Sequence, residues 1–426
     1  MTRSALRKVA LQILRAGLDA VEPGRLVRQN LRVTGTGISA GGVKIRTSKR
    51  LFMVAVGKAA IPMARAAHRI LGTRLRSGIV IAPVKAPRMS RMKIFVARHP
   101  VPDAAGVKAG EAVIRLLATA QEDDVILLLL SGGASALMPA PIEGVSLADK
   151  QRVTRRLLKV GATIAEMNAV RKRLSRLKGG GFARLAAPAR VVALALSDVP
   201  GDDVSTIASG PAVEDSRVAT LARKAVQKHV RIENDLPPSV RAALEKAPLK
   251  RSTEIRADTR VIGSGRTFAE GARRKATSLG FACEVIPDAL HGEARDMGPA
   301  LVAAFRRSKN SRPKCLIVSG ETVVKVKGRG IGGRNQELAL SAIPALENMA
   351  QPTVFAAFAT DGRDGPTTAS GGMVDDETGT KARALHLSVT KALRQNSSHD
   401  ALRRTGALIV TGPTSTNVAD IALVLG

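Results

Sequence analysis

The sequence predicts an α/β protein: a doubly wound, mostly parallel sheet domain followed by a second α/β domain with a mixed sheet. Short, continuous apolar runs alternate with longer helical patterns along the chain, as expected of parallel strands that helices cover on both faces. The 426 residues are enough for two or three domains, and the hydrophobic fraction of 45% supplies each with a core.

The alternation is most regular in the first half of the chain. Residues 1–20 have apolar side chains near helical spacing and predict a helix, although their basic, nearly acid-free composition is also typical of a mitochondrial transit peptide. The apolar runs that predict strands are 51–56, 78–82, 93–97, 125–130 and 191–196. The helical patterns are 58–71, 104–119, 146–160, 162–176 and 217–229.

A polar stretch at 231–257, which contains Pro237, Pro238 and Pro248, predicts the domain boundary. We therefore expect domains of residues 1–240 and 241–426. The runs that predict strands beyond it are 260–262, 282–286, 315–318, 323–326, 354–358 and 407–410. Residues 318–324 look like two strands joined by a tight turn at Gly320, so the second sheet is expected to be mixed.

The composition narrows the class of protein. The formal charge of +32 suits a nucleic-acid binder, but the chain has no Trp, no Tyr and only 8 Phe on which bases could stack. We interpret most of this charge as a solvated surface that binds nucleic acid at most nonspecifically. No apolar run is long enough to span a membrane. The two cysteines, Cys283 and Cys315, cannot form a disulfide framework, which favours a cytoplasmic location.

Ligands of open parallel sheets bind beyond the carboxyl ends of the strands, so polar residues after apolar runs are candidate site residues. Lys58 follows the run 51–56 at the predicted start of a helix. A cation there opposes the helix dipole unless it and the free amides hold an anion. A lysine that bends into solvent is the alternative.

A second junction follows the run 125–130. Ser131, Gly132, Gly133 and Ser135 are small residues whose amides can converge on an oxyanion. They are candidate substrate-binding residues, and a plain strand-to-helix turn is the alternative.

Carboxylates follow two other runs. Asp198 comes after 191–196, in a segment that continues to Ser209-Gly210-Pro211, and Asp361 comes after 354–358. Asp198 could orient or deprotonate a hydroxyl, or hold Mg²⁺, and Asp361 could contact a metal or a substrate hydroxyl. A helix cap or an Asx turn is the ordinary role of such residues.

A glycine-rich loop at 328–333 leads into a predicted helix at 334–343 that begins with Arg334. The guanidinium fork suits a phosphate or a carboxylate, and pairing with Glu337 or another acid of the chain is the alternative. So many glycines indicate that the backbone approaches something closely. We expect this loop to bind the cofactor through Gly330, Gly332, Gly333 and Asn335.

Three matches to other motifs are weaker. Gly263-Ser-Gly265 follows a strand and opens a helix, but it lacks the third glycine of a dinucleotide fingerprint. The Gly-x-Ser-x-Gly match at 37–41 precedes extended chain and predicts a hairpin rather than a nucleophile elbow. The histidines show no zinc spacing, and His99, which follows a strand, is the one of interest. Metal ligands stay unassigned.

Cations at helix starts, glycine nests and strand-end carboxylates together indicate phosphoryl transfer, which depends on positioning and on neutralising charge. The chain also resembles the two-domain glycerate 2-kinases of the MOFRL type. The matching segments are VGKAA at 56–60, HPVPD at 99–103, LSGGASAL at 130–137, MNAVRKRLSRLKGGGFA at 167–183, LSDVPGDDVSTIASGPAV at 196–213, SGETVVKVKGRGIGGRNQELAL at 319–340, ATDGRDGPT at 359–367 and VTGPTSTNVAD at 410–420.

The resemblance implies transfer of the γ-phosphoryl group of ATP, with Mg²⁺, to the 2-hydroxyl of D-glycerate in a cleft between the domains. It implies essential roles for Lys58 and Arg334, with Asp198 as a third member of the catalytic set. One departure is Ala134, which stands where the family has a glycine and would be strained if its φ were positive.

Two other functions stay open at this point. One is an NAD(P)H-dependent hydroxypyruvate reductase, a name used for relatives of this family. The other is a basic nucleic-acid-binding protein without catalysis.

Overall fold

The computed structural model describes residues 1–46, 50–229, 236–245, 255–308 and 313–426. They form two compact units. The parallel-sheet unit comprises Pro23–Leu196 and Asp202–Ile262, and the mixed-sheet unit comprises Met1–Glu22, Ser197–Gly201 and Gly263–Gly426. The fold class predicted from the sequence is confirmed: one sheet is parallel and the other is mixed.

The sheet of the parallel-sheet unit has the strand order β6-β5-β4-β7-β8-β9. Its strands are β4 (Leu51–Val56), β5 (Leu75–Ala82), β6 (Met92–Val96), β7 (Val125–Leu130), β8 (Arg190–Leu196) and β9 (Ala257–Gly263). Every residue of β4 and β7 is buried, because these central strands are covered on both faces. The chain order runs outward from β4 in one direction and from β7 in the other, so the topological switch point lies between these two neighbours.

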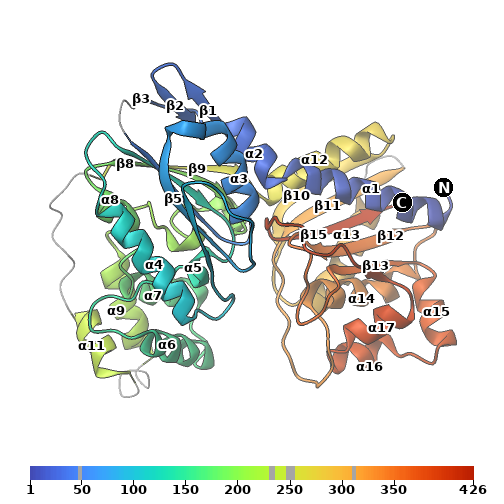
Figure 1. The fold of residues 1–426 in the computed structure, drawn as a ribbon. Coiled ribbons are helices and arrows are strands. Elements are labelled where there is room, and N and C mark those ends of the chain that lie inside the picture. Colours follow the sequence, from blue (N-terminus) through green and yellow to red (C-terminus); the bar gives the residue numbers. More distant parts are fainter. Residues whose placement is uncertain (47–49, 230–235, 246–254, 309–312) are drawn as a thin grey trace. The chain divides into compact units, whose positions relative to one another are not determined.

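Helices connect and cover these strands (Figure 1). They are α2 (Pro23–Asn30), α3 (Ala60–Leu71), α4 (Ala104–Leu117), α5 (Ala134–Leu137), α6 (Leu147–Lys159), α7 (Ile164–Arg173), α8 (Gly181–Ala186), α9 (Val218–Lys228) and α11 (Pro238–Glu245). Ser146 and Thr163 begin α6 and α7 with capping boxes to Asp149 and Glu166.

A small antiparallel sheet precedes β4. It consists of β1 (Leu31–Thr34), β2 (Gly37–Ala40) and β3 (Val43–Arg46). The Gly-x-Ser-x-Gly match forms β2 and the turn to β3, where Gly41 and Gly42 have φ of 57° and 82°. It lies in a hairpin, as the sequence predicts, and not at a strand-to-helix elbow.

The mixed sheet has the order β10-β11-β15-β12-β13-β14. Its strands are β10 (Ala282–Leu290), β11 (Lys314–Gly320), β12 (Val354–Ala359), β13 (Gly371–Asp375), β14 (Leu408–Ile409) and β15 (Asp420–Leu425). Strand β15 is antiparallel to both β11 and β12. The ends of β11 and β12 and the start of β15 therefore meet at one edge of the sheet.

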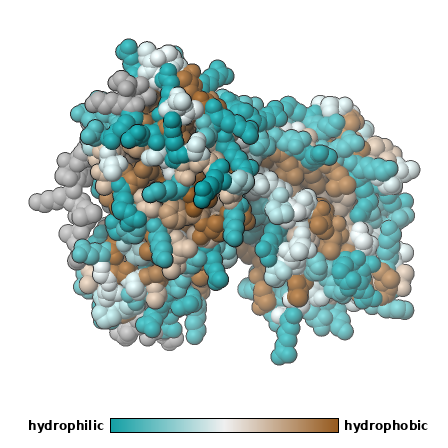
Figure 2. Space-filling model, in the orientation of Figure 1, coloured by the Kyte–Doolittle hydropathy of each residue, from teal (hydrophilic) through white to brown (hydrophobic). Residues whose placement is uncertain are grey.

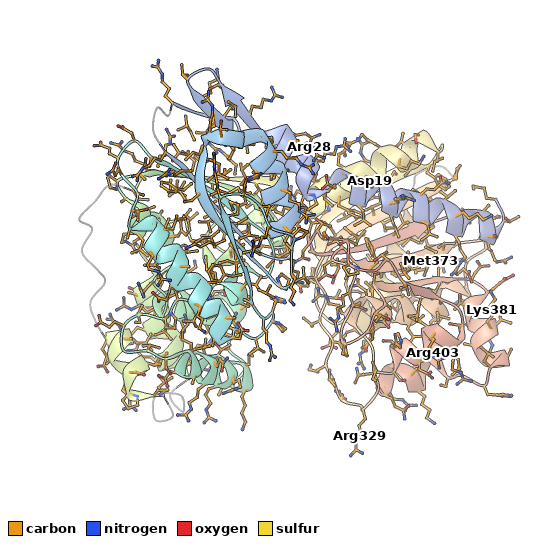
Figure 3. The ribbon with its side chains drawn as sticks, in the orientation of Figure 1. Asp19, Arg28, Arg329, Met373, Lys381 and Arg403 are labelled. Atoms are coloured by element: carbon orange, nitrogen blue, oxygen red, sulfur yellow. The ribbon has the colours of Figure 1, made fainter. Side chains whose placement is uncertain are left out.

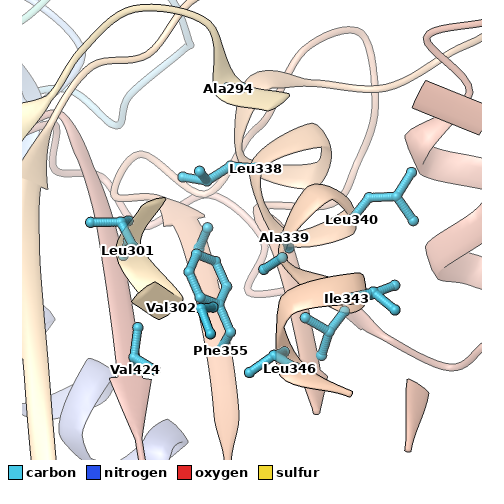
Figure 4. Close-up of a cluster of buried hydrophobic side chains, with 14 of the residues drawn as sticks. Ala294, Leu301, Val302, Leu338, Ala339, Leu340, Ile343, Leu346, Phe355 and Val424 are labelled. Carbon is cyan, nitrogen blue, oxygen red and sulfur yellow. The ribbon is translucent and has the colours of Figure 1, made fainter. Parts of the chain in front are cut away.

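Helices cover both faces of this sheet (Figure 1). One face carries α1 (Arg3–Ala20) and α12 (Gly265–Ser278), and the other carries α13 (Ala294–Arg307) and α14 (Arg334–Leu346). Short helices α15 (Thr378–Ala384), α16 (Val389–Arg394) and α17 (Ser398–Arg404) follow. Figure 4 shows the core under α14, where Leu301 and Val302 of α13 lie beside Phe355 of β12 and Val424 of β15.

The expected division at residues 240 and 241 differs from the two units in three places, one of which is that Ser197–Gly201 belongs to the mixed-sheet unit. Helix α1 belongs to the mixed-sheet unit, because its Gly17 lies directly against the buried ring of Phe268 on α12. The expected strand 260–262 is part of β9 and extends the parallel sheet, since Val191 donates to the carbonyl of Arg256. Of the expected boundary stretch, residues 231–235 and 246–254 lie outside the described residues.

The expected strand 323–326 is wrong. Both sides of β11 are already paired, one with β10 and one with β15, so no position remains for a returning strand. Residues 321–333 form a loop with a single bridge between Val323 and Glu293. Figure 3 shows Arg329 at the far end of this loop, pointing away from the unit.

Candidate functional site

The first part of the site lies at the switch point of the parallel sheet, where β4 and β7 end in register at Val56 and Leu130. The amide of Lys58 donates to the carbonyl of Gly132 at 2.9 Å, and the amide of Ala59 donates to Ser131 Oγ at 3.0 Å. Lys58 and the 131–135 loop are therefore brought together, as expected. Helix α3 begins at Ala60, so Lys58 lies in the turn before the helix and not at its first position.

Two glycines make this close approach possible. Gly57 has a φ of 130°, and a Cβ there would overlap Ser131. Gly133 has a φ of 84° and lies against the His99 ring. Ala134 is the first residue of α5 and follows Gly133, so the replacement of a glycine by alanine does not place a side chain in the left-handed region.

The sequence argument missed the buried partners of Ser135. Lys178 Nζ donates to the carbonyl oxygen and to Oγ of Ser135, at 2.9 and 2.5 Å. Ser209 Oγ lies 3.1 Å from Ser135 Oγ. Ser209 has a φ of 65° and stands between Ala208 and Gly210, which are also left-handed, and such strain is typical of functional turns. The three glycines that follow Lys178 in the sequence were the one local signal for this residue. Its burial depends on the tertiary structure and could not be predicted.

The second part of the site lies at the strand-end edge of the mixed sheet. Asp420, the first residue of β15, is in register with both Gly320 and Ala359, the last residues of β11 and β12. Its carboxylate is buried and accepts from the guanidinium of Arg334, with Nη2 3.2 Å from Oδ1. Arg334 also pairs with Glu321. Burial raises the pKa of Asp420, and the ion pair with Arg334 opposes this shift.

The start of α14 is already neutralised by the chain itself. The amides of Asn335 and Gln336 donate to the carboxylate of Asp364 at 3.1 and 2.8 Å, as in a helix cap. Together with Asp420 and Glu321, this carboxylate offsets the cation at the helix start. The position of Arg334 at the helix start therefore needs no bound anion to be favourable, and anion binding by this residue stays a prediction.

The glycines of the 328–333 loop make room for other parts of the chain. A Cβ on Gly333 would overlap the Asp364 carboxylate, and one on Gly330 would overlap the backbone at Gln395. The side chain of Asn335 is fully buried. The close approach predicted for this loop is thus to its own unit, and contact of Gly330, Gly332, Gly333 and Asn335 with a cofactor stays a prediction.

The two candidate carboxylates also belong to the mixed-sheet unit. Asn417 Nδ2 donates to Asp198 Oδ2 at 2.7 Å. Asn417 lies three residues before Asp420 in the chain. Asp361 follows β12 and accepts from the amide of Arg363 at 3.0 Å, which is an Asx turn. Since three residues span at most about 10 Å, the segment 417–420 holds Asp198 and Arg334 at the same edge.

The predicted site residues thus form two groups. Lys58, Ser131, Gly132, Gly133 and Ser135 belong to the parallel-sheet unit, whereas Asp198, Asp361 and Arg334 belong to the mixed-sheet unit. The predicted segment 196–213 divides between them, because Ser197–Gly201 belongs to one unit and Asp202 onward to the other.

The visible surface of both units is largely hydrophilic. Figure 2 shows hydrophilic side chains spread over the visible face of each unit, consistent with a solvated charged surface. Among the described helices, none combines the length and the apolar character that a membrane span requires.

An α/β fold with a glycine-rich loop at the switch point of a parallel sheet is typical of proteins that bind phosphate or carboxylate ligands beyond the strand ends. Residues 9–245 match the family model described as "Domain of unknown function (DUF4147)", and residues 314–420 match the MOFRL family. The chain is 41% identical to the D-glycerate 2-kinase of Thermotoga maritima, over 98% of each chain. It is 35% identical to the glycerate 2-kinase of Pyrococcus horikoshii, over 99% of this chain and 97% of that one.

A solved structure of Thermotoga maritima glycerate kinase has a TM-score of 0.86 to this chain at 40% identity, with 99% of each chain covered. The chain therefore belongs to the two-domain glycerate kinase family of the MOFRL type.

Proposed function

We propose that this chain is an ATP-dependent glycerate 2-kinase, a phosphotransferase that converts D-glycerate to 2-phosphoglycerate. The observation that carries the proposal is the end-to-end likeness to proteins named D-glycerate 2-kinase and glycerate 2-kinase. The nest at the switch point supports it, because a carboxylate substrate and a phosphoryl group both need converging donors.

The reaction requires little covalent chemistry from the protein. The 2-hydroxyl oxygen of glycerate forms a bond to the γ-phosphorus while the bond from this phosphorus to the β–γ bridging oxygen breaks. ADP leaves with that electron pair, and the hydroxyl proton is released. Lys58 and the 131–135 loop hold anionic groups at the reacting centre. Asp198, oriented by Asn417, directs the hydroxyl or takes its proton late.

Arg334 stabilises the transferring phosphoryl group in this proposal. A guanidinium has five N–H donors, and among the described residues Asp420 and Glu321 accept from three of its nitrogens. The pKa of Arg334 is raised by these carboxylates, so the side chain stays charged. The ion pair holds the guanidinium in one orientation.

Mg²⁺ would enter with the nucleotide. The described residues contain no group of three or more His, Cys, Asp or Glu side chains able to form a resident metal site. Nucleotide-bound Mg²⁺ commonly uses only one or two carboxylates besides phosphate oxygens. Asp198 and Asp361, both partly exposed at the strand-end edge, fit that demand. The metal would neutralise charge on the phosphates.

The test is direct. Purified protein with ATP, Mg²⁺ and D-glycerate should release ADP, and phosphorus NMR should identify the product as 2-phosphoglycerate rather than 3-phosphoglycerate. Omission of glycerate is the control for nucleotide hydrolysis. A panel of related hydroxy acids, including tartronate, would define the acceptor.

Hydroxypyruvate reduction is the second candidate, because two relatives from Agrobacterium vitis, 37% and 36% identical, are provisionally named hydroxypyruvate reductase. The incomplete dinucleotide fingerprint at Gly263 and Gly265 argues against this function. Its third glycine position holds Phe268, whose fully buried ring fills the space against α1. NADH oxidation by hydroxypyruvate without any ADP release in the kinase assay would reverse our choice.

A further inference from the structure

The parallel-sheet unit holds three cations close together, and one of them, Lys178, contacts the 131–135 loop. Lys150 on α6 and Lys178 after α7 are nearly inaccessible to solvent, and Arg171 on α7 is partly exposed. The acceptors of the two lysines are neutral oxygens: Lys150 donates to the carbonyl of Leu174 at 2.9 Å, and Lys178 donates to Ser135.

This arrangement is unusual because buried cations are ordinarily paired with an acid. Lys172, the neighbour of Arg171 on α7, is paired in this way: its Nζ lies 3.4 Å from Oδ2 of Asp215. For Lys150, Arg171 and Lys178, no carboxylate of the described chain enters an ion pair or acts on the pKa. Burial and the neighbouring cations lower the pKa of Lys178 well below its ordinary value and that of Lys150 to about 8.

The hydrogen bonds of Ser135 show what such a charge can do. A charged Lys178 can only donate, so it occupies a lone pair of Ser135 Oγ and leaves the hydroxyl hydrogen to point elsewhere. The acceptors for this hydrogen are Ser209 Oγ, at 3.1 Å, or a ligand at the loop. Lys178 thus fixes Ser135 Oγ as a donor toward Ser209 or toward a ligand.

We propose that Lys178, with Lys150 and Arg171 near it, is the positioning residue that supplies the charge with which the 131–135 loop binds an oxyanion of the substrate. The missing counter-charge of the three cations is then the carboxylate or phosphoryl group of the ligand. The name of the substrate rests on the proposed kinase function, whereas the anion subsite does not.

The experiment measures binding without nucleotide or turnover. Inorganic phosphate, D-glycerate and 2-phosphoglycerate are titrated into wild type and Lys178→Met by calorimetry at constant sodium chloride. We expect the affinity of Lys178→Met to fall at least tenfold for the ligands whose oxyanion occupies the subsite. Loss with glycerate alone identifies the carboxylate, and loss with phosphate alone identifies the phosphoryl group.

The matched control is Lys159→Met, which removes one exposed charge at the end of the same helix that carries Lys150. It accounts for nonspecific attraction of anions to a chain of formal charge +32, and its affinity should stay within twofold of wild type. Lys178→Arg, which restores a cation, should recover part of the lost affinity.

Thermal unfolding separates positioning from simple support of the loop. Added 2-phosphoglycerate should raise the melting temperature of wild type and leave that of Lys178→Met nearly unchanged. Equal ligand-induced shifts in both proteins would overturn the inference. If Lys178→Met does not fold, Arg171→Met must weaken binding at least threefold, and wild-type affinity in that variant would equally overturn it.

The experiments distinguish failure of the anion subsite from failure of the proposed kinase function. A protein that binds glycerate through Lys178 but releases no ADP would keep the subsite and lose the proposed function. A protein that is an active kinase, with wild-type affinity and KM in Lys178→Met, would keep the function and lose the subsite.

Discussion

Arg334, the first residue of α14, is held by the buried carboxylate of Asp420, the first residue of β15. Because Asp420 is in register with the last residues of both β11 and β12, this ion pair attaches the start of the helix to the centre of the strand-end edge. The cation is thereby placed by the fold itself, and a ligand meets a guanidinium that is already oriented.

Arg334→Met should lower the free energy of unfolding by about 3–5 kcal/mol, because it leaves a buried carboxylate unpaired. Adding Asp420→Asn should restore much of this stability. Urea unfolding measures both effects. If Arg334 stabilises the transferring phosphoryl group, the double variant should remain inactive although it is stable, and recovery of activity together with stability would show a purely structural role.

Lys58→Met should reduce kcat/KM by a factor of about 10²–10³, the loss expected when one donor to developing charge is removed. The steady-state release of ADP measures this. Lys44→Met, which removes an exposed charge from the β2–β3 hairpin, is the control and should keep wild-type kinetics. Wild-type turnover by Lys58→Met would refute the role of this lysine.

Asn417→Leu removes the donor that orients Asp198. We expect kcat to fall by about 10–100-fold while the KM for glycerate changes little, because a small displacement of a reacting group costs rate more than binding. Asn348→Ala, which removes an exposed amide that donates to the carbonyl of Pro344 near the end of α14, should leave both constants unchanged. An unaltered kcat in Asn417→Leu would contradict the role of Asp198 at the hydroxyl.

Gly57→Ala tests the contact between the two strand ends. The alanine would have to adopt a φ of 130° and overlap Ser131, so the stability should fall by about 3 kcal/mol or more. Gly144→Ala places a Cβ at a φ of 78° in open space and should cost only about 1 kcal/mol. Similar losses in the two variants would mean that the loop yields to the added methyl group.

Lys150 predicts a pH dependence. Its folded-state pKa is lowered to about 8 from 10.5, so the unfolded chain binds more protons between these values and stability rises with pH there. Below pH 8 the charge costs at most about 3 kcal/mol. Lys150→Met should therefore be more stable than wild type at pH 7, and its advantage should shrink as the pH rises from 8 to 10.5. A pH-independent difference in chemical unfolding would contradict this.

Much of the fold was predictable from local patterns. The runs that became β4, β7 and β12 are wholly apolar, and such short runs between helical patterns predict strands that are buried on both faces. The junctions after β4 and β7 predicted that Lys58 and the 131–135 loop lie together, since the ends of parallel strands meet at one edge of a sheet.

Other features depended on contacts between distant segments. Three of the residues 323–326 are valines, and the run looks like a strand, but β11 already pairs with β10 on one side and with β15 on the other. The helix at the N-terminus was predictable as a helix, whereas its place against α12 depends on Gly17 meeting Phe268.

The sequence by itself indicated the strands of the parallel sheet and the polar residues that follow them, because periodicity and strand-end chemistry are local properties of the chain. Only the tertiary structure decided which charges are compensated. Asp420 and Asp364 neutralise the start of α14 from far along the chain, whereas Lys150 and Lys178 are buried with neutral acceptors. A charge is stabilised by what surrounds it in space, and no spacing along the chain specifies that environment.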